Sequence, residues 1–258
     1  MIPESPKISI ITINYNNMEG LNKTIQSVIT QSYPHVEYIV IDGGSDDNSK
    51  SVIKTQEDRI AFWVSEPDSG IYNAMNKGIR TATGDYLLFI NSGDVLLNKE
   101  VIADVVKQGM KKDLVCGNLI FEKESGREEW IPAEEVTFKT FLYSTIPHPT
   151  TLIKRSVFDK VGLYNESHKI VSDWEFFILA SCKYNCTYQH VDVFMTAYDD
   201  GGVSSNPHNF DVINAERESV LNQHFPYFIK DYEDYDAETR MRKKNKIHHR
   251  VKRFFKRL

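Results

Sequence analysis

The sequence predicts an α/β fold with a mainly parallel central sheet, helices on both faces of that sheet and a helical C-terminal tail. Strand-like and helix-like patterns alternate through the first hundred residues, beginning with the β-branched run KISIITI at 7–13. A helix-length segment between successive strands is the spacing of parallel strand–helix–strand units. Basic residues gather at the other end of the chain, where 240–258 hold ten Lys or Arg and no Asp or Glu.

The elements of the first half are predicted by short apolar runs and by apolar residues at helical spacing. Runs such as EYIVI and YLLFI, bounded by turn residues, are typical of strands buried on both faces. The predicted strands are 7–13, 37–41, 60–64 and 86–90, and the predicted helices are 21–29, 47–55, 71–82 and 99–110.

The second half of the chain is less regular. Its patterns predict strands at 114–121 and 150–153, a polar loop at 122–132, helices at 138–143 and 173–184, and an extended segment at 187–198. No linker composition marks a boundary near residue 112, so we expect this half to complete the same sheet.

Composition narrows the class of protein. Of the 258 residues, 41% are hydrophobic and 26% are charged, which is ordinary for a globular chain with one large core. Outside 240–258 there are 21 basic and 36 acidic residues, so the body is too acidic for a nucleic-acid-binding surface. The three cysteines form no CxxC pair, no secretory signal is visible, and no apolar run approaches the roughly 20 residues of a membrane span. These features predict a cytoplasmic protein.

Three polar clusters lie at the ends of predicted strands, namely Thr12–Asn16, Asp42–Ser45 and Asn91–Asp94. Ligands of parallel sheets bind beyond the carboxyl ends of the strands, so these clusters are expected to line one crevice. Tyr15 could stack on a nucleobase, Asp42 could accept hydrogen bonds from a ribose or base, and Asp94 could hold a divalent cation on a diphosphate. One such cluster is more often only a polar turn, but three in register favour a site.

Six stretches carry a resemblance to a known family. They are ISIITINYNN at 8–17, VITQSYP at 28–34, VIDGGSDDNS at 40–49, SEPDSGIYNAMNKGIRTATGDYLLFINSGD at 65–94, HPTTLIKRSVFDKVGLYNE at 148–166 and SDWEFF at 172–177. In this order they resemble the family 2 glycosyltransferases, especially those that build bacterial polysaccharides such as O-antigens and capsules. The resemblance implies a GT-A fold, sugar transfer with inversion from a nucleotide-activated donor, most commonly a uracil nucleotide, and a Mg²⁺ or Mn²⁺ cofactor.

The resemblance also implies roles for individual residues. Gly43 stands where the family has a second acid after Asp42. In the metal motif only Asp94 keeps a carboxylate, so a cation is expected to bind weakly without nucleotide. The residues expected around the donor are Thr12, Asn14, Tyr15, Asp42, Asp68, Asn76, Lys77, Asn91, Ser92, Asp94, His148 and Trp174, with Asp94 as the metal ligand.

Asp173 matches the general base of the family. A carboxylate in that role takes the proton of the attacking acceptor hydroxyl as the new bond forms. The start of a helix favours an ionised carboxylate, but an Asp after Ser172 can also be only a helix cap. Glu175 is the reserve candidate. For His148 and Trp174, a structural place in the core is the alternative to a role in binding.

The C-terminal tail predicts a membrane partner. Five apolar residues of 240–258 follow helical spacing with basic residues between them, namely Ile247, Val251, Phe254, Phe255 and Leu258. Basic amphipathic helices bind anionic membranes, although a solvated helix or one packed on a partner subunit is the alternative. Together with the resemblance, this predicts a nucleotide-sugar donor, a lipid-linked oligosaccharide acceptor and a peripheral location on the inner face of the cell membrane.

The expected domain organisation follows from the same features. We expect a single GT-A catalytic domain over 1–236, with a nucleotide-sugar-binding half to about residue 112 and an acceptor half over 113–236. A basic amphipathic helix over 237–258 is expected to follow. No nucleic-acid partner is expected.

Other functions fit the sequence less well. A noncatalytic nucleotide-sugar-binding module is the main alternative, because the metal motif has lost acids. A Rossmann dehydrogenase is disfavoured since no G-x-G-x-x-G follows the first strand, and a sugar-nucleotide pyrophosphorylase would need a glycine-rich basic loop there.

Overall fold

The structure is a computed structural model that describes residues 5–123, 126–199, 201–232 and 234–235. The chain divides into two compact units, Met1–Asn209 and Phe210–Leu258. Every strand of the described residues lies in the first unit, and residue 112 lies inside that unit rather than at a boundary. The basic segment 237–258 falls outside the described residues.

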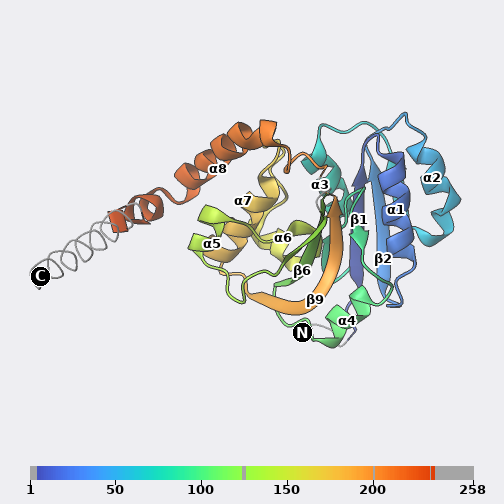
Figure 1. Cartoon of the computed structure of the whole chain (residues 1–258), viewed down its shortest axis with the longest axis horizontal. Coiled ribbons are helices and arrows are strands. Elements are labelled where there is room, and N and C mark those ends of the chain that lie inside the picture. Colours follow the sequence, from blue (N-terminus) through green and yellow to red (C-terminus); the bar gives the residue numbers. More distant parts are fainter. Residues whose placement is uncertain (1–4, 124–125, 200, 233, 236–258) are drawn as a thin grey trace, which may run out of the picture. The chain divides into compact units, whose positions relative to one another are not determined.

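One sheet of nine strands forms the centre of the first unit, in the order β3-β2-β1-β4-β8-β6-β9-β5, with β7 paired to β6 (Figure 1). The first four strands of this order are parallel, whereas β8 runs antiparallel to both β4 and β6. β9 is parallel to β6 and antiparallel to β5. The bounds are β1 Ile8–Asn14, β2 Val36–Asp42, β3 Phe62–Ser65, β4 Tyr86–Phe89, β5 Val95–Leu96, β6 Leu114–Lys123, β7 Gly126–Trp130, β8 Thr151–Lys154 and β9 Tyr188–Asp199.

Helices connect the strands as the periodicity predicts. The helices predicted at 21–29, 47–55, 71–82, 99–110 and 138–143 are confirmed, each within a few residues of its predicted ends. The bounds are α1 Met18–Ile29, α2 Ser49–Thr55, α3 Ile71–Thr81, α4 Val101–Lys107, α5 Phe138–Tyr143, α6 Ser156–Val161, α7 Ser172–Ile178 and α8 Phe210–His224. The helix predicted over 173–184 is α-helical only to Ile178 and continues as a π-helical turn, Leu179–Lys183.

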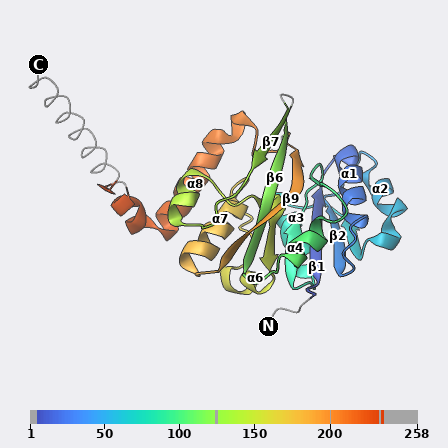
Figure 2. The same ribbon diagram turned by 60° about the horizontal axis from the view of Figure 1, so that its bottom comes forward.

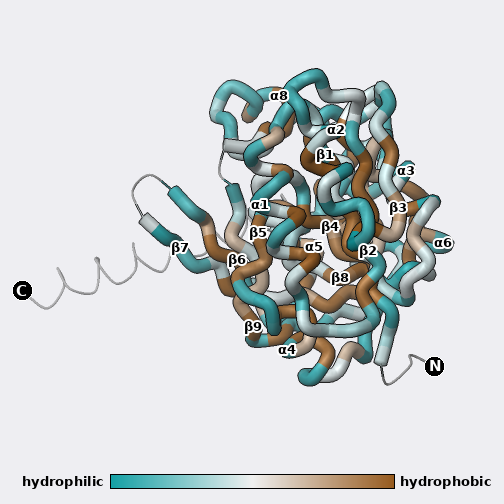
Figure 3. Tube along the Cα trace, turned by 90° about the vertical axis from the view of Figure 1, so that its right-hand side faces the viewer, coloured by the Kyte–Doolittle hydropathy of each residue, from teal (hydrophilic) through white to brown (hydrophobic). Residues whose placement is uncertain are grey.

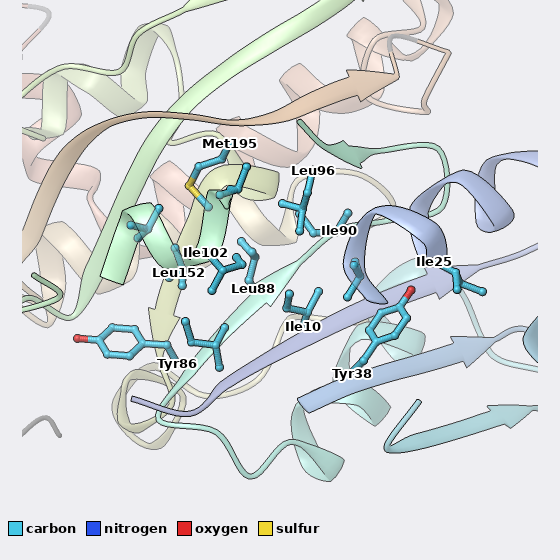
Figure 4. Packing of buried hydrophobic residues seen from close by; sticks show 14 of the residues in the cluster. Ile10, Ile25, Tyr38, Tyr86, Leu88, Ile90, Leu96, Ile102, Leu152 and Met195 are labelled. Carbon is cyan, nitrogen blue, oxygen red and sulfur yellow. The ribbon is translucent and has the colours of Figure 1, made fainter. Parts of the chain in front are cut away.

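The core has two parts, one on each face of the sheet, because successive residues of a strand point to opposite faces. Ile10, Tyr38 and Leu88 point to the face covered by α1 and α4, where they join Ile25 and Ile102 in one cluster (Figure 4). The opposite face of β1 is covered by α3. A Cβ atom built on Gly78 of α3 would lie 2.5 Å from Cγ2 of Ile11, so the glycine permits the close approach of helix and strand.

The prediction of a polar loop at 122–132 is wrong, because β7 pairs there antiparallel to β6 (Figure 2). β7 is almost entirely exposed and hydrophilic, so it lacks the alternating apolar pattern that marks a half-buried strand (Figure 3). Opposite charges support the pairing instead: Arg127 contacts Glu122 at 2.7 Å and Lys123 contacts Glu128 at 2.5 Å.

Three further elements had no predicted counterpart. β5 has only two residues, α6 has six, and α8 belongs to the second unit, where Val220 is its one buried residue. Short elements and helices with little apolar surface give a weak periodic signal. Within the described residues, none of the helices combines the length and the apolar character that crossing a membrane would need.

Glu37 joins three segments at the amino end of the parallel strands. Its Oε1 accepts hydrogen bonds from Lys7 Nζ and Thr83 Oγ1, each at 2.6 Å, and its Oε2 accepts from Ser9 Oγ at 2.6 Å. Burial alone would raise the pKa of Glu37, but these hydrogen bonds lower it to about 2. The carboxylate is therefore stabilised in its ionised form by folding.

We predict that Glu37→Gln lowers the free energy of unfolding by about 2 kcal/mol at neutral pH. The folded pKa lies below the ordinary value, so the contribution of Glu37 is complete above about pH 4.5 and is lost as the pH falls toward about 2. Urea unfolding at several pH values measures this, with the exposed Glu57→Gln as the control. An equal loss in both variants at neutral pH would contradict the prediction.

Candidate functional site

The polar clusters that follow the strands lie together at one edge of the sheet. Asn14 at the end of β1 is in register with Asp42 at the end of β2, and Asp42 is in register with Ser65 of β3. The backbone N–H of Ser92 donates to the carbonyl of Ile13 at 3.1 Å, which brings the turn after β4 to the same edge. The predicted convergence of these segments is therefore present.

Asp42 is the centre of a buried hydrogen-bond network. Its Oδ1 accepts from Asn14 Nδ2 at 2.7 Å and from Ser45 Oγ at 2.6 Å. Its Oδ2 accepts from Ser65 Oγ at 2.6 Å and from the Ser45 N–H at 3.0 Å. Burial would raise the pKa of Asp42, but the hydrogen bonds from Ser45, Ser65 and Asn14 lower it below its ordinary value. Oδ1 of Asn14 is buried and has no partner in the described residues.

Tyr15 and Asp68, two of the residues expected around the nucleotide-sugar donor, lie at the surface beside this network. Tyr15, directly after β1, is 68% exposed. Asp68 lies close to Gly43, and its Oδ1 accepts the N–H of Gly70 at 3.0 Å. Lys77 forms an ion pair with the segment before Asp68, with its Nζ 2.8 Å from Glu66 Oε1.

Asp94 sits under the end of β9. The register of β5 with β9 pairs Val95 with Ala197, and the N–H of Asp199 donates to Asp94 Oδ1 at 3.2 Å. Asp94 is only 4% exposed. Burial raises the pKa of Asp94 to about 7, and the negative charge of Asp199 adds to that shift. A Cβ atom built on Gly93 would lie 2.8 Å from Asp199 Oδ2, so the two acids and this glycine are close neighbours.

These carboxylates could hold a hard divalent cation. Mg²⁺ and Mn²⁺ prefer oxygen ligands, and Asp94 and Asp199 supply them side by side. Across the described part of the chain, no group of three or more His, Cys, Asp or Glu residues could hold a metal ion. The donor set therefore fits a cation that takes its remaining ligands from a diphosphate and water.

Asp173 lies in the first turn of α7, and its side chain is partly exposed. The hydroxyl of Tyr72 lies 3.1 Å from Asp173 Oδ1 and also donates to the carbonyl of Ile170. Burial, with the charge of Asp173 in second place, raises the pKa of Tyr72 well above its ordinary value. The reserve candidate Glu175 is buried instead, with its Oε2 3.2 Å from His168 Nε2.

Asp94 and Asp173 both lie near enough to Tyr198 of β9 to influence its pKa. Burial is the main cause of the raised pKa of Tyr198, and the charges of Asp94 and Asp173 both raise it further. Hydrogen bonds with Ser204 and Ser205 oppose the shift. Both carboxylates therefore lie within electrostatic reach of one side chain, although they come from elements far apart in the sequence.

Thr12 and Asn76, two of the residues expected around the nucleotide-sugar donor, are buried. Thr12 is fully buried, and its hydroxyl donates to the Ile90 carbonyl at 2.7 Å, which links β1 to the segment after β4. Asn76 of α3 is also buried, and its amide donates to the Tyr164 carbonyl at 2.9 Å and accepts the Tyr164 N–H at 3.0 Å. Both side chains are engaged inside the protein and position the segments that reach the surface.

His148 and Trp174 also face the interior. Trp174 is 2% exposed, and its Nε1 donates to the carbonyl of Phe141 at 3.1 Å. A ring in that position does not present a face for stacking on a sugar. His148 is stacked on Phe89, and its Nε2 lies 2.8 Å from the Tyr164 hydroxyl. Burial lowers the pKa of His148, with an opposing effect from Asp173, so the ring is stabilised in its neutral form.

The turn after β4 holds the last two expected residues. The Ser92 carbonyl accepts from Asn17 Nδ2 at 3.1 Å, which ties the turn to the start of α1. Oδ1 of Asn91 is buried without a partner in the described residues.

Sequence reasoning missed Asp199, Tyr72 and Tyr198. Asp199 directly follows an extended segment, as Asp42 and Asp94 nearly do, and that shared position was the available signal. The pairing of β5 with β9 decides that Asp199 meets Asp94, and a two-residue strand leaves no periodic pattern in the sequence.

We predict that Asp94→Asn stabilises the metal-free protein above neutral pH. The folded pKa of about 7 lies above the ordinary value of 3.8, so the wild type loses stability as the pH rises from about 4 to about 7. The advantage of Asp94→Asn should therefore grow by about 3 kcal/mol between about pH 5 and about pH 8. Urea unfolding in a chelating buffer measures it. The exposed Asp58→Asn is the control, and a pH-independent difference for Asp94→Asn would refute the prediction.

The chain matches one protein family and several named relatives. Residues 9–168 match the glycosyl transferase family 2. An uncharacterized glycosyltransferase of Mycobacterium tuberculosis is 31% identical over 233 residues, which cover 86% of this chain and 87% of that protein. A PGL/p-HBAD biosynthesis glycosyltransferase of Mycobacterium bovis is 26% identical over 78% of this chain and 80% of that protein.

Solved structures share the fold. Staphylococcus aureus TarS 1–349, in complex with UDP-GlcNAc, aligns with a TM-score of 0.64 at 18% identity over 86% of this chain and 73% of that chain. The mannosyltransferase PcManGT from Pyrobaculum calidifontis, in complex with GDP-Man and Mn²⁺, aligns with a TM-score of 0.60 at 15% identity over 87% of this chain and 64% of that chain. The predicted family and GT-A fold are confirmed. The chain belongs to glycosyl transferase family 2 and is a glycosyltransferase.

Proposed function

We propose that the protein transfers a sugar, with inversion, from a nucleoside-diphosphate sugar to an acceptor hydroxyl during synthesis of a bacterial surface polysaccharide. The observation that carries this proposal is that the segments after β1, β2 and β4 meet at one edge of the sheet, where the N–H of Asp199 donates to Asp94 Oδ1 at 3.2 Å. The charges of Asp94 and Asp173 both raise the pKa of Tyr198, which supports a candidate base in the neighbourhood of the candidate cation ligand. The complexes of TarS with UDP-GlcNAc and of PcManGT with GDP-Man support a donor of this class, and we propose a UDP-linked sugar.

In the proposed reaction, the acceptor oxygen attacks the anomeric carbon from the face opposite the diphosphate. The bond between that carbon and the diphosphate oxygen breaks, the nucleoside diphosphate leaves, and the acceptor proton passes to the carboxylate of Asp173. The Tyr72 hydroxyl, 3.1 Å from Asp173 Oδ1, holds this carboxylate in place. Asp173 is partly exposed, so an acceptor can reach it.

A divalent cation is part of the proposal. Asp94 and Asp199 would hold it, and when bound it would neutralise charge on the leaving diphosphate. The Mn²⁺ of PcManGT supports this choice. Asn91 and Gly93 stand where the family has acids. This loss of carboxylates is the feature that supports the alternative, a noncatalytic nucleotide-sugar-binding module.

We predict that Asp173→Asn lowers kcat by roughly 100- to 10,000-fold, the usual contribution of a general base. Affinity for the nucleotide should stay the same, because Asp173 faces the acceptor in this proposal. A thermal-shift screen of nucleotide sugars with Mn²⁺ first identifies the donor, and calorimetry and product formation then compare wild type, Asp173→Asn and the exposed Asp159→Asn. Turnover by Asp173→Asn close to wild type would remove Asp173 from the mechanism. Nucleotide binding by the wild type without any turnover would favour the noncatalytic alternative.

We also propose a single catalytic domain over 1–236 and a basic membrane-binding helix over 237–258, with a lipid-linked oligosaccharide as the acceptor. The ten Lys or Arg of 240–258 support it, since each basic residue near an anionic surface contributes about 1 kcal/mol to binding. The protein would then act at the inner face of the cell membrane.

We predict that deletion of 240–258 abolishes sedimentation of the protein with vesicles that contain phosphatidylglycerol. The full chain should sediment with these vesicles at low salt and lose that binding at high salt, because the attraction is electrostatic. Vesicles of phosphatidylcholine alone are the control. Equal sedimentation of the full and shortened chains with anionic vesicles would rule out the tail as the anchor.

A further inference from the structure

The carboxylate of Asp42 has no acceptor capacity left for a ligand. A carboxylate offers about four lone-pair positions, and four protein donors already occupy those of Asp42 at 2.6–3.0 Å. The side chain is also fully buried. Asp42 therefore organises the turn after β2 and does not touch the donor.

Another carboxylate occupies the space beside that turn. A Cβ atom built on Gly43 would lie 2.5 Å from Oδ2 of Asp68 and 3.2 Å from Cδ2 of the Tyr15 ring. Contacts under 3.0 Å essentially never occur at a real Cβ, so the Asp68 carboxylate fills the volume that a side chain at position 43 would need. Gly43 is thus the gap that lets Asp68 and Tyr15 approach each other.

Asp68 keeps one oxygen available. Its Oδ1 accepts the Gly70 N–H at 3.0 Å, whereas its Oδ2 has no donor among the residues that the structure describes. Asp68 is partly exposed, and the neighbouring Tyr15 is 68% exposed. An aromatic face beside a free carboxylate oxygen fits a flat ligand with an N–H on its edge.

Nucleobases differ at that edge. Uracil carries a ring N–H at N3 and guanine at N1, so either can donate to a carboxylate oxygen. Cytosine N3 and adenine N1 carry lone pairs, which the negative charge of Asp68 would repel, so these two bases could donate only through their exocyclic amino groups. A carboxylate oxygen that faces the ring nitrogen therefore favours uracil and guanine over cytosine and adenine.

We propose that Asp68 selects the base of the nucleotide donor, by accepting its ring N–H through Oδ2 while Tyr15 stacks on the base. The inference rests on the proposed function, and it assigns the selection to Asp68 in place of Asp42. Gly43 takes part only by leaving room for the carboxylate.

Calorimetry of the full chain with UDP, GDP, CDP and ADP, each with Mn²⁺, tests the assignment. The wild type should prefer UDP or GDP over CDP and ADP. Asp68→Asn should weaken binding of the preferred nucleotide by about 10- to 100-fold, since the ring N–H no longer meets a charged acceptor. It should also reduce the difference in affinity between the preferred nucleotide and CDP, because an amide can donate to cytosine N3. Asp46→Asn, the same charge change at an exposed position of the neighbouring loop, should bind as wild type does.

Gly43→Ala supplies an independent test, because its methyl group would displace the Asp68 carboxylate. It should weaken binding about as much as Asp68→Asn does in the wild-type background. In an Asp68→Ala background, the same Gly43→Ala change should alter affinity by no more than about twofold, since nothing remains to displace. Thermal unfolding of each variant confirms that it is folded.

Three results would overturn the assignment. If Asp68→Asn keeps the wild-type base preference, Asp68 does not read the base. If it weakens all four nucleotides equally, Asp68 contacts the ribose or phosphates instead. Both results leave the proposed function intact. If the wild type binds none of the four nucleotides, the proposed function itself fails and the assignment fails with it.

Discussion

The buried carboxylate of Asp42 is the constraint on which the edge of the sheet depends. Its four hydrogen bonds draw on Asn14 of β1, on Ser45 after β2 and on Ser65 of β3. A buried charge without such partners would cost several kcal/mol, so the three segments must end in one arrangement. The loops that carry Tyr15 and Asp68 leave from these fixed points, and their side chains meet across Gly43 as a result.

The long strand β9 connects this edge to the second half of the sheet. It runs beside β6 along its length (Figure 1). Near the end of β9, its other edge also pairs with β5. That course places Tyr198 and Asp199 against Asp94, which belongs to the turn after β4. The turn after β4, in the parallel half of the sheet, thus supplies Asp94, and β9, in the mixed half, supplies Asp199. A glycosyltransferase that uses a cation here needs both halves of the sheet.

The acids of the site set its electrostatic character. Asp94 and Asp199 repel each other, and burial already makes ionisation of Asp94 unfavourable. A diphosphate brings further negative charge, so the proposed donor requires a cation between it and these carboxylates. His148, whose buried ring is neutral, and Trp174, which lies in the core, pack inside the protein. Neither adds a positive charge that would offset these acids.

The sequence by itself determined the order and type of most elements, because buried strands and amphipathic helices have periods that any chain of this kind must show. It also determined that polar residues follow β1, β2 and β4, and those residues do meet. Tertiary structure decided which of them are buried. Asp42, Thr12 and Trp174 turn inward, whereas Asp68 and Asp199 gain their neighbours from Gly43 and from the pairing of β5 with β9. Burial and long-range register depend on contacts between distant segments, and no local pattern encodes them.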